Sequence, residues 1–139
     1  MTQWHMKSVR KPSGGVRNSR NRSDKRLSWK GGDTTLTTIA DSDEKARVDL
    51  MDGVGGTNKL AAKSVFYANV LNPNDQKSKK AQILSVHQND ANRLFTRRNI
   101  ITKGALIRVK LDGSERIAKV SSRPGQDGAV NAILVEEKK

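Results

Sequence analysis

The sequence predicts an all-β fold, a small closed or nearly closed β-barrel with a basic, extended N-terminal tail. From Leu60 onward, short stretches rich in branched side chains recur between turn-forming residues, which is the pattern of an all-β domain. Aromatic residues make up only 4% of the chain, and strands this short and numerous favour a small barrel over a large sandwich. The first 30 residues show no sustained period of two or 3.6, which predicts a separate tail.

The tail is residues 1–30, and residues 31–139 are predicted to form the barrel body. The tail carries nine basic side chains against one acid, Asp24. It cannot bury enough apolar area to offset an ordering cost of roughly 1–2 kcal/mol per residue, so we expect it to be disordered when free. A mere solubility tail is the alternative. Against it, most of the charges are arginines, two tryptophans are present, and Gly14-Gly15 allows close approach to phosphate.

Residues 31–60 reverse the charge, with six acids against three bases, and we expect them to turn away from a polyanion. Two short strands are predicted at Thr34–Ile39 and Ala46–Met51, with Asp41-Ser42-Asp43 as the turn between them. The glycine-rich stretch 53–59 lacks the spacing of a phosphate-binding loop. It is predicted to be a flexible hairpin loop.

Six further strands are predicted, at Lys63–Leu71, Ala81–Gln88, Asn99–Thr102, Ala105–Leu111, Arg116–Ser122 and Ala129–Glu136. Asp112-Gly113 is predicted to be a hairpin turn, because this pair tolerates the positive φ of tight primed turns. Either Asn89 or Asp90 is a candidate cap for a single helical turn that runs into Arg93.

Three arginines, Arg93, Arg97 and Arg98, stand before the branched residues of Asn99–Thr102, and Lys103-Gly104 then breaks the run as a turn or bulge would. The arginines are therefore predicted to sit at the mouth of a strand. With no acidic block beside them, they suit an anionic partner better than an internal salt bridge. An ordinary solvated charged loop is the alternative.

The formal net charge of +13 and a sequence pI near 10.4 predict attraction to polyanions, with nucleic acid as the leading partner class. We expect no membrane partner, because the sequence has no apolar run long enough to span a bilayer and no basic amphipathic helix with a bulky apolar side. No secretory signal is visible. The chain has no cysteine, which excludes disulfides and thiolate metal sites and is compatible with the cytoplasm.

The sequence predicts no enzyme, metal site or cofactor. His5 and His87 lie far apart and lack a ligand pattern, and no catalytic triad or paired carboxylates are apparent. Asp127 is expected to make local hydrogen bonds in the turn before the last strand. Only Phe66 and Tyr67 are adjacent aromatics, with side chains expected on opposite sheet faces, so recognition should use phosphates and shape instead of base stacking.

Three stretches resemble a known family. They are Trp4–Gly15 (WHMKSVRKPSGG), Arg97–Ala105 (RRNIITKGA, preceded by Asn92-Arg93) and Val120–Ala132 (VSSRPGQDGAVNA). They are similar, in the same order, to the archaeal and eukaryotic small-subunit ribosomal protein eight. The resemblance implies a β-barrel body, a basic extension threaded along ribosomal RNA, a structural role in the small subunit, and an archaeal type of chain. Val9 stands where family members commonly have a basic residue, the surroundings of Leu94-Phe95 differ, and no resemblance is apparent over residues 31–60.

We therefore predict a cytoplasmic, ribosome-bound protein that contacts small-subunit ribosomal RNA and neighbouring ribosomal proteins. A free nucleic-acid-binding barrel, such as a translation factor or chromatin-like protein, is the second hypothesis, and an RNA-processing enzyme is the third. The residues predicted to bind RNA are glycines, one aromatic and cations of tail and body: Trp4, Lys7, Arg10, Lys11, Gly14, Gly15, Arg17, Arg20, Arg22, Lys25, Arg26, Lys79, Lys80, Arg93, Arg97, Arg98, Lys103 and Arg123.

Overall fold

The computed structural model describes residues 3–5, 7–18 and 29–135. The chain divides into two compact units, Met1–Thr34 and Thr35–Lys139. In the first unit, β1 (Gln3–Trp4) pairs antiparallel with β2 (Lys30–Gly31). A second antiparallel contact joins Arg10 to Val16.

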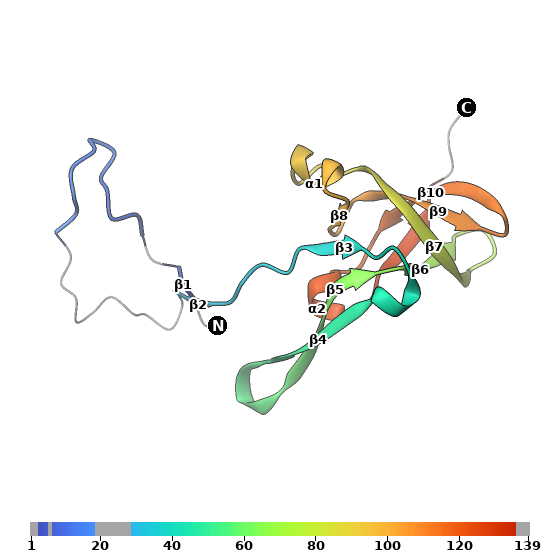
Figure 1. The fold of residues 1–139 in the computed structure, drawn as a ribbon, viewed down its shortest axis with the longest axis horizontal. Coiled ribbons are helices and arrows are strands. Elements are labelled where there is room, and N and C mark those ends of the chain that lie inside the picture. Colours follow the sequence, from blue (N-terminus) through green and yellow to red (C-terminus); the bar gives the residue numbers. More distant parts are fainter. Residues whose placement is uncertain (1–2, 6, 19–28, 136–139) are drawn as a thin grey trace. The chain divides into compact units, whose positions relative to one another are not determined.

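The second unit contains a closed five-stranded barrel (Figure 1). Its strands are β6 (Tyr67–Asn72), β7 (Lys77–Gln88), β9 (Leu106–Leu111), β10 (Ser114–Val120) and β11 (Asn131–Leu134), joined in the order β10-β11-β6-β7-β9. All neighbours are antiparallel except β11 and β6, which run parallel. The predicted all-β barrel is confirmed.

Alternation along each strand fills the barrel with small and branched side chains. In β9, Ile107, Val109 and Leu111 are buried, whereas the residues between them, Arg108 and Lys110, are exposed. The two strands that flank β9, β7 and β10, also bury alternate residues, because every second side chain of a strand points to the same face of the sheet. The strand predicted at Ala105–Leu111 is therefore confirmed, with β9 beginning at Leu106.

A four-stranded sheet lies beside the barrel in the order β4-β5-β3-β8. Its strands are β3 (Thr37–Ile39), β4 (Arg47–Asp52), β5 (Asn58–Val65) and β8 (Ile100–Ile101). The two strands predicted at 34–51 are present, but β5 lies between them, and a 3₁₀ turn, η3 (Asp43–Lys45), precedes β4. The predicted hairpin loop is also present. It contains η4 (Val54–Gly56), and β5 begins earlier than the loop's predicted end.

The single strand predicted at Lys63–Leu71 is wrong. The chain bends at Phe66, so that β5 ends at Val65 in one sheet and β6 begins at Tyr67 in the barrel. The backbone N–H of Ile83 donates to the Phe66 carbonyl at 2.9 Å, which holds the bend from the neighbouring β7. Because of the bend, the Phe66 and Tyr67 rings meet edge to face, with centroids 4.7 Å apart, and do not lie on opposite faces of one strand.

Two predicted turns have the expected local chemistry. Asp112 and Gly113 join β9 to β10 with φ values of 50° and 84°, as a primed turn requires. The stretch before the last strand folds as a short helix, α2 (Pro124–Asp127), which ends at Gly128 with φ of 73°. As predicted, the Asp127 carboxylate bonds locally, accepting from the Arg123 backbone N–H at 2.8 Å.

The helical turn before β8 is α1 (Arg93–Arg97), and its cap differs from both predicted residues. Asn92 is the N-cap, and its side-chain oxygen accepts from the Leu94 backbone N–H at 2.9 Å. Asn89 is buried instead and holds the loop to β8, since its amide donates to the Ile100 carbonyl at 3.2 Å. In the part of the chain that the structure describes, no helix has the length and apolar character needed to cross a membrane.

Candidate nucleic-acid interface

The arginines of the α1 region form an exposed cluster on a rigid support. Arg93 and Arg97 belong to α1, Arg98 is its C-cap residue, and all three are exposed. The strand that follows, Ile100–Ile101, is buried in the core. Among the described residues, none of the three arginines forms an ion pair. Their guanidiniums are therefore open to an anionic partner.

The helix explains how adjacent arginines are both exposed. In an extended chain, Arg97 and Arg98 would point to opposite faces of a sheet. Here Arg97 ends the helix, and the Arg98 backbone N–H still donates to the Leu94 carbonyl at 3.2 Å. Successive residues of a helix are about 100° apart, so both side chains remain on the solvent side.

A second group of cations lies on the outer face of the barrel. Lys80 of β7 points outward, with its Nζ atom 4.0 Å from the centroid of the Tyr67 ring. Arg108 and Lys110 of β9 share this outward direction, and Arg108 Nη2 lies 3.3 Å from His87 Nδ1. Sequence reasoning missed Arg108 and Lys110. The alternation of 106–111 was sufficient to find them, because it places every second residue outside.

Lys79 lies at one end of the barrel, in the inward-facing row of β7. Its partner across the strands is the buried Val70, and its Nζ atom is 2.6 Å from Asp112 Oδ2. Both side chains of this ion pair are largely exposed, so the pair contributes little stability and a phosphate can compete for the lysine.

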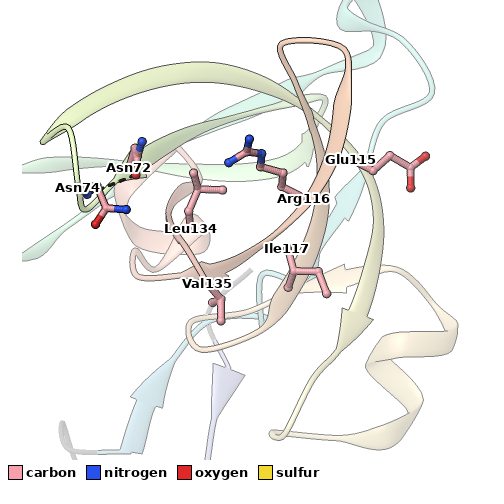
Figure 2. Close-up of a pocket in the computed structure, with 7 residues that line it drawn as sticks. All are labelled: Asn72, Asn74, Glu115, Arg116, Ile117, Leu134 and Val135. Carbon is pink, nitrogen blue, oxygen red and sulfur yellow. Dashed lines mark hydrogen bonds between the residues drawn. The ribbon is translucent and has the colours of Figure 1, made fainter. Parts of the chain in front are cut away.

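Arg116 belongs to the same end of the barrel and lines a hollow of about 290 Å³ with Asn72 and Leu134. Figure 2 shows its guanidinium turned toward Asn72, whereas the neighbouring Glu115 points the other way. Lys77 lines an adjoining hollow with Arg116. Neither cation was among the predicted site residues, because barrel closure, not local sequence, brings them together.

The remaining predicted cations of the body lie in loops. Lys103 is exposed in the turn between β8 and β9, where Gly104 has φ of 87°. Arg123 is the exposed N-cap residue of α2. The structure thus distributes the predicted body residues over three places: the α1 cluster, the β7 strand and these two loops.

The tail residues belong to the first unit. Trp4 lies in β1, and Lys7, Arg10 and Lys11 are exposed. Gly14, with φ of 85°, turns the chain, and Gly15 accepts a hydrogen bond from the Lys11 N–H at 2.8 Å. Arg17 returns along the other side, donating its backbone N–H to the Val9 carbonyl at 2.8 Å. The other four predicted tail residues, Arg20, Arg22, Lys25 and Arg26, lie outside the described residues.

A group of acidic side chains lies in and around η3 and β4 of the second unit. Lys45 pairs with Asp41 at 3.3 Å, and Arg47 pairs with Asp49 at 2.7 Å. The described residues include no group of three or more histidine or carboxylate side chains placed to hold a metal ion.

Comparison with known proteins gives consistent matches along the chain. The family model for ribosomal protein S8e matches residues 4–135. The small ribosomal subunit protein eS8 of Sulfolobus acidocaldarius is 43% identical over 139 residues, covering 99% of this chain and 100% of that protein. The protein of the same name from Ignicoccus hospitalis is 39% identical over 138 residues, with coverages of 99% and 100%. That of Methanosphaera stadtmanae is 40% identical over 136 residues, with coverages of 98% and 100%.

Proposed function

We propose that this chain, which belongs to the ribosomal protein S8e family, binds folded ribosomal RNA in the small subunit through phosphate and shape contacts. Membership gives the chain a structural role in the ribosome. Because the family is one of structural ribosomal proteins, the chain is not an enzyme, and the third hypothesis, an RNA-processing enzyme, is rejected.

The α1 cluster is the observation that carries the proposal. Arg93, Arg97 and Arg98 are exposed, have no ion-pair partner among the described residues, and precede a buried strand. A guanidinium on a fixed backbone loses less entropy on binding than one on a tail, and its planar fork matches phosphate oxygens. Lys80, Lys103 and Arg123 are further exposed cations of the body.

The aromatic residues support phosphate and shape recognition over the reading of bases. Phe66 and Tyr67 contact each other edge to face, and Lys80 lies over the Tyr67 ring. Both rings are only partly exposed. A stacking platform for single-stranded bases needs several open ring faces on neighbouring strands, and these two rings do not offer them.

The proposal places the protein in the cytoplasm, bound to small-subunit ribosomal RNA and to neighbouring ribosomal proteins. The alternative, a free barrel that binds nucleic acid reversibly, predicts a different response to salt. Small subunits carrying the tagged protein would be sedimented at increasing salt. A constituent of the subunit stays in the pellet through moderate salt, whereas a factor held by exposed charges washes off first. Release together with loosely bound factors would overturn the proposal.

A further inference from the structure

The hairpin of β4 and β5 carries an apolar face that continues outward from the core. At its inner end, Ala62 is fully buried opposite Val48, and nearer the turn Leu50 lies directly opposite Leu60. Val48, Leu50 and Leu60 are 48%, 66% and 49% exposed. We call these three residues the hairpin patch. Figure 1 shows the hairpin extending beyond the rest of the body.

The end of α2 covers only the inner part of this face. A Cβ atom placed on Gly128 would lie 2.6 Å from Leu60 Cβ and 3.5 Å from Val48 Cγ1. Lys59 Nζ, on the neighbouring residue, is 2.8 Å from Gln126 Oε1. Beyond this contact, the described residues of the Thr35–Lys139 unit leave the patch open. Branched side chains that are exposed side by side indicate an interaction surface, whereas single exposed ones do not.

The charge around the patch is opposite to that of the whole molecule. Residues 41–60, which contain the hairpin, have five acids and three bases, in a chain of net charge +13. Lys45 pairs with Asp41 and Arg47 with Asp49, Lys59 bonds to Gln126, and Asp52 lies on the same face of β4 as Leu50. RNA phosphates are repelled by such a surface, whereas a basic protein segment is attracted.

The strand geometry also favours a protein partner. β4 is the terminal strand of its sheet, and no described strand pairs with its outer edge. An edge strand presents backbone N–H and C=O groups to which an extended peptide can add. A second copy of this chain fits poorly, because the same acidic surface would face itself.

We propose that the hairpin patch binds a basic, apolar, extended segment of a neighbouring protein in the assembled small subunit. The inference rests on the proposed function, since it places the protein in that subunit. It adds a second surface of opposite character: the cations contact RNA, and the hairpin patch contacts protein.

Site-specific photo-crosslinking in assembled small subunits tests the proposal. Benzoylphenylalanine would replace Leu50 in one variant and Lys110, on the outer barrel face, in another. We expect position 50 to join a peptide rich in lysine and arginine from another protein, identified by mass spectrometry, and position 110 to join ribosomal RNA. The inference is overturned if position 50 joins RNA, a second copy of this chain, or nothing, while position 110 still joins RNA. If neither variant enters the subunit, the proposed function fails as well.

A charge variant separates binding at the patch from simple proximity. With the probe at position 50, Leu60→Lys should lower the crosslink yield by roughly fivefold or more, because the partner would bury an unpaired ammonium. Ser78→Lys adds the same charge on an exposed position of β7 and should leave the yield unchanged. Equal yields in both variants would show that the patch does not bind the partner.

Discussion

Asn89 is a buried polar residue whose hydrogen bonds join the α1 loop to β8. Its amide group donates to the Ile100 carbonyl at 3.2 Å, and its oxygen accepts from the Ala91 N–H at 3.1 Å and the Thr102 hydroxyl at 3.0 Å. Replacement by alanine removes these bonds, of which the one to Ile100 is buried and the other two are partly buried. We expect Asn89→Ala to lower the free energy of unfolding by about 2–3 kcal/mol, measured by urea denaturation.

The neighbouring Asp90 gives a matched control for that measurement. Its side chain is exposed and accepts from the Gln88 amide at 2.7 Å. Asp90→Ala should change stability by less than about 0.5 kcal/mol. If both variants unfold at the same urea concentration as the wild type, Asn89 does not hold the loop.

Alanine substitutions at Gly128 and Gly113 distinguish the cost of a left-handed backbone from the cost of a steric clash. Both have positive φ, but a Cβ atom at Gly113 meets nothing within 4 Å, whereas one at Gly128 lies 2.6 Å from Leu60 Cβ. Gly113→Ala should lower the free energy of unfolding by about 1–2 kcal/mol, which is the cost of holding alanine in the left-handed conformation. Gly128→Ala adds a clash, so its melting temperature should fall further. Equal losses in thermal unfolding would contradict the close packing of α2 on β5.

The elements α1 and β8 have different roles in the proposed interface: α1 carries the arginines that we expect to bind RNA, and β8 anchors the backbone beside them in the core. The arginines of α1 are exposed, and Ile101 of β8 is buried in the core. We expect Arg97→Ala with Arg98→Ala to weaken RNA binding by about 1–3 kcal/mol for each charge-assisted hydrogen bond to phosphate that the substitution removes. The melting temperature should barely move, because alanine keeps the backbone bonds of the helix end.

Ile101→Asp supplies the comparison, since it places a carboxylate in the core and should unfold the body. Affinity for a ribosomal RNA fragment and thermal unfolding would be measured on the same samples. A double arginine variant that unfolds as readily as Ile101→Asp would show that these arginines are structural.

Elements were predictable where their cause is local. Asp112-Gly113 contains the residues that a primed turn needs, and the alternation of Ile107, Val109 and Leu111 reports one buried face. No glycine or proline marks the bend at Phe66 in the sequence. A hydrogen bond from Ile83 in another strand holds the bend, and local sequence does not show it. Asn89 and Asn92 are equally able to cap a helix. Tertiary burial selects Asn89 for the core and leaves the cap to Asn92.

The predicted binding residues show the same limit. Arg93, Arg97 and Arg98 could be proposed from the sequence because they directly precede a run of strand-forming residues. Arg116 and Lys77 were not, since they approach each other only when the barrel closes. Residues that are far apart in the sequence and meet only in the folded protein cannot be recognised as neighbours from one sequence.

For the whole molecule, the tail holds much of the positive charge. Residues 1–30 have nine basic side chains and one acid, out of a net charge of +13. If about six to ten cations neutralise phosphates, affinity for a ribosomal RNA fragment should fall on the order of 10³–10⁵ between about 50 and 200 mM salt. Deletion of residues 1–30 should flatten this dependence, as measured by filter binding. An unchanged slope would mean that the tail makes no phosphate contacts.

The parallel pairing of β11 with β6 has a consequence for synthesis. Asn131 pairs with Asn69 and Ala132 with Val70, so the strand made last closes the barrel against the one made first. Every other barrel strand has been translated before this pair can form, and a parallel pair cannot arise from a local hairpin. A growing chain therefore carries two unpaired strand edges, on β6 and on β10, until synthesis passes Leu134.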